Sequence, residues 1–222
     1  MKLFKGEIDR LFGESEYLSE NFSKKDFISY LLESESLPED AFFEAELEQE
    51  KRARLLEKAV RVLNGEPLQY VVGFAYFYRS RFFVKEGLLI PRRDSEVVVD
   101  AAVECIPKNS HFIDLCTGTG CLGLSVLLER PDTTATLSDI SDTALEASRK
   151  NAEALGVLDR CTFLKLDVLN DSLELLPEHS AIIMNPPYLT KDEMEKIPKN
   201  VAFEPSLALF GGGDGLEFYK AI

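Results

Sequence analysis

The run Asn185-Pro186-Pro187-Tyr188 combines residue types whose order suggests chemistry on a flat polar group. Its two prolines fix two backbone φ angles and remove two N–H donors. The Asn185 side-chain oxygen and the Pro186 carbonyl can therefore both accept hydrogen bonds from one NH2 group. The Tyr188 ring can stack on the planar group that carries this NH2. We interpret the run as a substrate-binding segment, Pro187 included, while an ordinary turn is the competing interpretation.

Such an arrangement suits methyl transfer to an amide nitrogen, which is a poor nucleophile because its lone pair is delocalised into the carbonyl. Two acceptors in fixed geometry draw on the amide hydrogens, raise the electron density at nitrogen and aim the lone pair at an electrophile. The sulfonium methyl group of S-adenosylmethionine needs neither an acid nor a metal for activation. We therefore predict a methyltransferase with Asn185, Pro186 and Tyr188 as catalytic residues and no metal.

A glycine turn over 114–120 links an apolar strand to an apolar helix. Glycine lets a ligand approach the backbone closely, and the helix N-terminus presents free N–H groups. The residues that we expect to bind a cofactor are Cys116, Thr117, Gly118, Thr119 and Gly120. This segment also has the GxGxxG spelling of dinucleotide-binding turns.

Three acidic or apolar positions at later strand ends extend this predicted cofactor site. Asp139 ends the second strand, where a carboxylate can accept hydrogen bonds from two ribose hydroxyls. Asp167 ends the third strand and could accept from an adenine amine while Val168 packs on the ring; a helix cap or a solvated loop acid is equally open. Together with Asn185 at the fourth strand end, these residues predict an adenosine-containing cofactor without deciding which one.

Alternating elements predict an α/β fold with a parallel sheet. Strands are expected over 111–115, 134–138, 161–166 and 180–184, with helices over 120–130 and 141–155. The chain up to Pro67 shows helical spacing, with a capping motif at Ser23 and a third helix over 40–63 that ends at Asn64-Gly65. Aromatic and β-branched residues over 70–78 and 81–84 predict a strand pair.

Composition narrows the class of protein. The chain has 222 residues, 45% of them hydrophobic, and a net charge of −14, which argues against non-specific nucleic-acid binding. No run is long enough to span a bilayer, and no secretory signal is evident. The four cysteines form no CxxC pair and only His111 and His179 are present, so a zinc site is not expected.

The sequence resembles the peptide chain release factor glutamine N5-methyltransferases, the HemK/PrmC family, over nearly its whole length. The glycine turn, Asp139 and the run Asn185–Tyr188 match the family's cofactor and substrate motifs. Four further segments are similar to the family pattern, namely 65–70 with Gly73 and Phe77, 89–96, Phe203-Glu204-Pro205 and 212–216. The Asn-Pro-Pro-Tyr run alone is shared with adenine-N6 DNA methyltransferases.

This resemblance implies a Rossmann-like class I S-adenosylmethionine-dependent methyltransferase domain over 92–222. It also implies a helical bundle over 1–68 that binds the substrate protein, and a β-hairpin linker over 69–91. The implied substrate is the glutamine of the GGQ tripeptide in release factors, with Pro91 and Arg92 beside it. The implied protein is a cytoplasmic monomer with no membrane or nucleic-acid partner.

Three departures from the family pattern carry expectations of their own. Cys116 stands where the family usually has glycine, so a positive φ there should weaken cofactor binding. Arg93-Asp94-Ser95 replaces a Pro-Glu-Thr run but keeps an acid and a hydroxyl. The sequence stops at Ile222, inside the helix after the fourth strand, so the family's C-terminal strands are expected to be missing.

Three other functions remain open from the residues alone. An adenine-N6 nucleic-acid methyltransferase would also bind a flat NH2 group, although no Lys/Arg-rich recognition segment is present. An NAD-binding oxidoreductase would use the GxGxxG spelling but leaves the Asn-Pro-Pro-Tyr run unexplained. An inactive protein that only binds its partner through the helical region is the third.

Overall fold

The computed structural model describes residues 3–15, 18, 23–42, 47–178 and 181–222. The chain divides into two compact units, Met1–Gly73 and Phe74–Ile222, and each unit has a hydrophobic core of its own. The division expected from the sequence, with a separate linker over 69–91, remains a prediction.

The first unit is helical, as its sequence pattern predicts. Its elements are α1 (Leu3–Glu14), α3 (Lys24–Glu33), the 3-10 turn η1 (Glu39–Phe42), α4 (Gln49–Leu63) and α5 (Leu68–Val72). The Ser23 side chain accepts a hydrogen bond from the Asp26 backbone N–H at 3.0 Å, so the predicted cap at the start of α3 is confirmed. The core of this unit is built from fully buried side chains of these helices, including Ile8, Phe27, Leu31, Leu55 and Val62.

Two predictions for this unit are wrong in part. The helix expected over 40–63 begins only at Gln49, because Glu39–Phe42 forms a separate 3-10 turn; residues 43–46 lie outside the described part of the chain. Residues 70–72, expected in a strand, belong to α5. Pro67 stands at the N-cap of this short helix with a φ of −56°, and Gly73 ends it with a φ of 85°. These two residues, rather than the β-branched side chains between them, decide the local backbone.

The second unit begins with the predicted strand pair and continues into a parallel sheet. Strands β1 (Phe74–Phe77) and β2 (Ser80–Phe83) pair antiparallel. The four-stranded sheet has the order β5-β4-β3-β6 and consists of β3 (His111–Leu115), β4 (Thr134–Asp139), β5 (Cys161–Lys165) and β6 (Ala181–Met184). Its helices are α6 (Glu96–Cys105), α7 (Cys121–Glu129), α8 (Asp142–Ala154), α9 (Lys191–Met194) and α10 (Glu217–Ala221). The predicted α/β, Rossmann-like class is therefore confirmed, although Ser180 at the expected start of the last strand lies outside the described residues.

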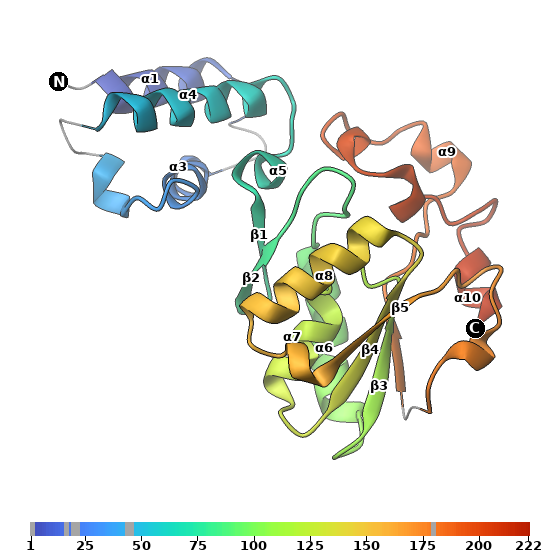
Figure 1. The fold of residues 1–222 in the computed structure, drawn as a ribbon. Coiled ribbons are helices and arrows are strands. Elements are labelled where there is room, and N and C mark those ends of the chain that lie inside the picture. The colour runs from blue at the N-terminus through green and yellow to red at the C-terminus, as the bar shows by residue number, and fades with distance from the viewer. Residues whose placement is uncertain (1–2, 16–17, 19–22, 43–46, 179–180) are drawn as a thin grey trace. The chain divides into compact units, whose positions relative to one another are not determined.

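Strand side chains alternate between two cores, one on each face of this sheet. Phe112, Leu137 and Ile183 pack with side chains of α6, α7 and α8 in one cluster. Ile113 and Met184 contribute to the other cluster, which includes Phe218 of α10. Figure 1 shows α6, α7 and α8 grouped on one side of the sheet and α10 on the other. Both faces are thus covered, which is typical of parallel sheets.

The strand register brings four chain segments to one edge of the sheet. Leu115 pairs with Ser138 of β4 and with Met184 of β6, and Asp139 pairs with Lys165 of β5. The segments that follow these strands therefore start at nearly the same level. Ligands of open parallel sheets bind at this carboxyl edge.

No helix within the described ranges is both long and apolar enough to span a membrane.

Candidate active site

A cavity of about 330 Å³ lies at the carboxyl edge of the parallel sheet. It is lined by loops that follow all four strands and by three segments from elsewhere in the second unit, 87–95, 205–208 and Phe218 of α10. Of the residues predicted for the site, it brings together Pro91, Arg92, Cys116, Thr117, Gly118, Thr119, Asp139, Asp167, Val168, Asn185 and Pro187. Gly120, Pro186 and Tyr188 do not line this cavity.

The glycine turn is held by hydrogen bonds to the neighbouring strand. The Thr117 N–H donates to the Ser138 carbonyl at 2.9 Å, and the Gly118 N–H donates to Asp139 Oδ2 at the same distance. Gly120 has a φ of 82°, and a Cβ there would lie 2.8 Å from the Leu124 side chain. Gly120 therefore permits close packing at the start of α7 rather than contact with a ligand.

Cys116 adopts the backbone conformation that the sequence left open. Its φ is 56°, in the left-handed region, where a side chain costs about 1–2 kcal/mol. Cys116 also lines the cavity, and burial raises the pKa of its thiol to about 12. The thiol is therefore neutral and not a nucleophile, and the strain at this residue lies in its backbone.

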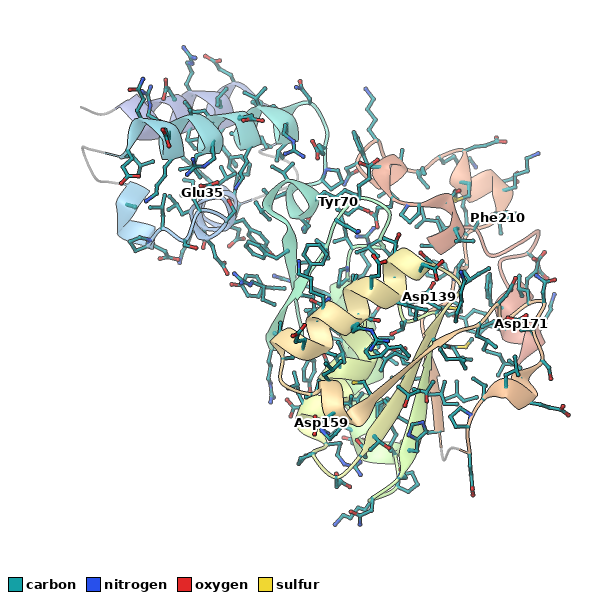
Figure 2. The ribbon with its side chains drawn as sticks, in the orientation of Figure 1. Glu35, Tyr70, Asp139, Asp159, Asp171 and Phe210 are labelled. Atoms are coloured by element: carbon teal, nitrogen blue, oxygen red, sulfur yellow. The ribbon has the colours of Figure 1, made fainter. Side chains whose placement is uncertain are left out.

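Asp139, which lines the cavity, is fixed by two backbone donors. Its Oδ2 accepts from Gly118 and its Oδ1 accepts from the Ser141 N–H at 3.0 Å. Burial raises the pKa of this carboxyl above its usual value. Figure 2 shows Asp139 where β4 ends at the carboxyl edge of the sheet. Each carboxylate oxygen keeps a second lone pair for a ligand donor.

Asp114 lies fully buried directly beneath the turn. Its Oδ2 accepts from Thr117 Oγ1 at 2.6 Å and from the Gly123 N–H at 3.0 Å. Its Oδ1 has no hydrogen-bond partner among the described residues. Burial, the largest cause, raises the pKa of Asp114 to about 7.

Asp167 organises its own loop in this structure. Its carboxylate accepts from the Leu169 N–H at 2.9 Å and from the Asn170 side chain at 2.7 Å. The Asn170 hydrogen bond, the largest favourable cause, lowers the pKa of Asp167. The contacts of Asp167 are therefore those of an acid that orders its own loop. Asp167 and Val168 also line the cavity.

The Asn-Pro-Pro-Tyr run divides between two adjoining hollows. Asn185 lines both the cavity described above and a second hollow of about 420 Å³. Pro186 and Tyr188 line only the second hollow, and the Tyr188 side chain is exposed. The Asn185 Nδ2 donates to Ser95 Oγ at 3.1 Å.

An ion pair between the buried Glu204 and the partly exposed Arg92 joins the segments around Pro91 and Pro205. Glu204 Oε2 accepts from the Ile90 N–H at 3.0 Å, while Oε1 pairs with the Arg92 guanidinium. Arg92 also donates to the Ile90 carbonyl at 3.0 Å. Only 2% of the Glu204 side chain is exposed. Arg92, which lines both hollows, is therefore held in a fixed position between them.

The glycine-rich segment near the C-terminal end packs against the Asn-Pro-Pro-Tyr run. A Cβ on Gly211 would lie 2.5 Å from Tyr188 Cα, and a Cβ on Gly215 would lie 2.3 Å from the Tyr188 carbonyl. The Gly211 N–H also donates to the Leu189 carbonyl at 2.9 Å. Glycine is required at both positions because the two backbones touch.

A family model described as a methyltransferase small domain matches residues 95–213. This match covers more than half of the chain, from the start of α6 to the glycine-rich segment. The chain belongs to the methyltransferase small domain family.

Curated relatives of this methyltransferase domain carry one shared name. The chain is 37% identical over 177 residues to the release factor glutamine methyltransferase of Neisseria gonorrhoeae, covering 80% of this chain and 64% of the relative. It is 37% identical over 159 residues to the protein of that name from Clostridium acetobutylicum, covering 70% and 56%. It is 38% identical over 184 residues to the protein of that name from Moorella thermoacetica, covering 82% of this chain and 64% of the relative. The chain thus spans less than two thirds of the length of these relatives.

Several residues that line the methyltransferase cavity were not predicted. Ile140 directly follows Asp139 at the end of β4, and Leu169 lies two residues after Asp167 in the loop that follows β5; they remain 40% and 41% exposed. For Ile140, a large apolar residue directly after a strand-end acid was the available signal. No sequence pattern pointed to Ser95 as a partner of Asn185.

The residues of this cavity fit an adenosine-containing cofactor. Asp139 offers a fixed carboxylate, and Ile140, Val168 and Leu169 offer apolar surface for a ring. Among the described residues, no group of His, Cys, Asp and Glu could hold a metal ion.

Proposed function

We propose that this chain transfers a methyl group from S-adenosylmethionine to the side-chain amide nitrogen of the glutamine in the GGQ motif of peptide chain release factors. The observation that carries the proposal is that Asn185 lines the same cavity as the glycine turn and Asp139. An acceptor for a substrate NH2 group thus adjoins the expected cofactor. The shared name of the relatives supports the release factor as substrate.

Each protein group has a proposed part in this reaction. Asp139 accepts hydrogen bonds from the ribose hydroxyls, and Asp167 and Val168 bind the adenine. The bound cofactor supplies an electrophilic sulfonium methyl group. Asn185 Oδ1 and the Pro186 carbonyl accept the two amide hydrogens and orient the nitrogen lone pair.

The second hollow is the proposed entry for the substrate glutamine. Tyr188 lies there with 54% of its surface exposed, ready to stack on a planar amide. Pro187 and Pro91 line the adjoining cofactor cavity and not the second hollow, whereas Arg92, fixed by Glu204, lines both and can donate to substrate carbonyls. These roles are supported by the residues that line each hollow and by Arg92 and Asn185, which line both.

We further propose the domain roles and setting implied by the sequence. The helical bundle over 1–68 holds the release factor, residues 69–91 form the linker, and residues 92–222 carry the chemistry. The protein acts as a monomer in the cytoplasm, without a membrane or nucleic-acid partner.

Transfer of tritium from labelled S-adenosylmethionine tests the substrate. We expect label in a release factor but not in the same factor with its GGQ glutamine replaced by glutamate, and not in DNA. Label in DNA alone would favour the adenine-N6 function and refute the proposal. Calorimetric titration should show binding of S-adenosylhomocysteine and none of NAD.

Two substitutions separate the proposed roles. Asn185→Ala should lower kcat by about 100-fold or more, because it removes an acceptor aimed at the reacting group, and should leave the affinity for S-adenosylhomocysteine nearly unchanged. Asp139→Ala should weaken that affinity instead. Normal turnover by the first variant, or unchanged affinity in the second, would contradict the assigned role.

A further inference from the structure

The amide of Asn185 has two nearly isosteric ends, and only one of them suits a substrate NH2 group. Its oxygen can accept a hydrogen bond, whereas its nitrogen can only donate. An Asn185 side chain turned by 180° would place two donors against each other. The proposed acceptor role therefore benefits from a neighbour that holds the Asn185 side chain in place.

Ser95 is the residue in contact with the nitrogen end. Asn185 Nδ2 donates to Ser95 Oγ at 3.1 Å, and both residues line the cavity. No hydrogen bond from a described residue reaches Asn185 Oδ1. This arrangement leaves the oxygen as the end available to a substrate.

A serine just before a helix usually caps that helix, and this competing role does not apply here. Ser95 precedes α6, but its φ of −78° and ψ of −8° are helical rather than extended, and its side chain makes no capping hydrogen bond. Its hydroxyl is therefore available to Asn185.

The backbone around Ser95 is anchored on both sides. The Ser95 N–H donates to the Arg92 carbonyl at 3.0 Å within η2 (Arg93–Ser95). The next residue, Glu96, accepts from the Tyr78 N–H at 2.8 Å. A hydroxyl on such a fixed backbone can restrain the position of a neighbouring side chain.

We propose that Ser95 is a positioning residue that holds the Asn185 side chain in place at its nitrogen end, beside the site of the methyl acceptor. This inference rests on the proposed amide-methylating function and adds to it the residue that holds the Asn185 side chain. Ser95 itself touches neither the cofactor sulfur nor the substrate nitrogen in this role.

Kinetics of three variants test the proposal. Ser95→Ala should lower kcat about three- to tenfold, the effect of one neutral hydrogen bond, without changing the KM for S-adenosylmethionine. Ser95→Thr keeps the hydroxyl and should restore most of the rate. Ser172→Ala removes a hydroxyl that accepts from the Glu174 N–H outside the cavity, so it should match the wild type. A Ser95→Ala rate within twofold of the wild type, or failure of Ser95→Thr to restore it, would overturn the proposal.

A spectroscopic readout separates this proposal from the proposed function. In protein labelled with 15N-asparagine, the side-chain NH2 signal of Asn185 is identified by its loss in Asn185→Ala. Hydrogen exchange of this NH2 group should be severalfold faster in Ser95→Ala and unchanged in Ser172→Ala. Equal exchange in the two variants would refute the orienting role, even if methylation is observed. Faster exchange in a protein that does not methylate release factor would instead refute only the proposed substrate.

Discussion

Cys116 has a side chain at a position of the turn where the backbone conformation favours glycine. Its φ of 56° suits glycine, and its thiol lies in the wall of the cavity where a cofactor is expected. Replacement by glycine removes about 1–2 kcal/mol of backbone strain and adds back less than 1 kcal/mol of unfolded-state entropy.

We therefore expect Cys116→Gly to raise the free energy of unfolding by about 0.5–1 kcal/mol. We also expect severalfold tighter binding of S-adenosylhomocysteine, measured by calorimetry, because the cavity loses a side chain. Gly118→Ala is the matched control. The backbone at Gly118 has a φ of 55°, and a Cβ added there would meet no atom within 4 Å. It should destabilise the protein through the backbone alone. A less stable Cys116→Gly variant would contradict the strain argument.

Asp114 links the stability of the turn to pH. Its pKa is raised to about 7 in the folded protein, from 3.8. A carboxyl with a raised folded pKa contributes stability that is fully present below its unfolded pKa and is lost as the pH rises through the folded value. Stability should therefore fall between about pH 4 and pH 7, by at most about 1.4 kcal/mol per pH unit from this group.

Asp114→Asn should remove this contribution to the slope. Asparagine keeps an oxygen that can accept from Thr117 and Gly123 but does not titrate. Urea unfolding at pH 5, 6 and 7 measures the slope for both proteins. Asp139 has a raised pKa as well, but it is present in both, so its effect cancels. Identical slopes would show that Asp114 does not hold a proton in this range.

At the scale of elements, the ion pair between the buried Glu204 and the partly exposed Arg92 joins two loops that no strand connects. Removing the charge of a buried, hydrogen-bonded carboxylate costs about 1.5–3 kcal/mol. We expect Glu204→Gln to lower the free energy of unfolding by this amount and to reduce kcat, because Arg92 loses its anchor beside the proposed substrate path.

Glu129→Gln provides the comparison for this change. Glu129 pairs with Arg79, whose side chain is 73% exposed, so the loss should be below about 1 kcal/mol. Denaturant midpoints of the two variants measure the difference. Equal effects would mean that the Glu204 pair acts as an ordinary surface contact.

The elements show what the sequence could and could not predict. Strands β3 to β6 were expected within a residue or two, because each is a short apolar run bounded by turn residues. Their parallel register then placed Asp139 and Asn185 at one edge. Residues 70–72 were misassigned because an apolar β-branched run suits a strand or a short buried helix equally well.

The partners of the site residues required the folded chain. Ser95 meets Asn185 across 90 residues, and Arg92 meets Glu204 across 112. Such contacts depend on how loops pack, which periodicity does not encode. The sequence thus predicted which strand ends form the site but not which side chains hold them in place.

At the scale of the whole molecule, the two units divide the proposed tasks. The core of the first unit is built from residues between Ile8 and Val72, and the main core of the second from residues between Phe77 and Ile183. All residues that line the cavity lie between Gly87 and Phe218, within the second unit. Cofactor binding should therefore not need the helical unit, whereas recognition of a release factor should.

Residues 74–222 produced alone test this division. We expect their affinity for S-adenosylhomocysteine to stay within about twofold of that of the 222-residue chain, because no cavity residue is lost. The KM for release factor should rise at least tenfold, while kcat at saturating factor should change little. The full chain carrying Arg54→Ala, which loses an exposed contact to Glu35, serves as the control for a disturbed but present helical unit. Loss of cofactor binding on deletion would show that the second unit depends on the first for its fold, and an unchanged KM would remove the helical unit from substrate recognition.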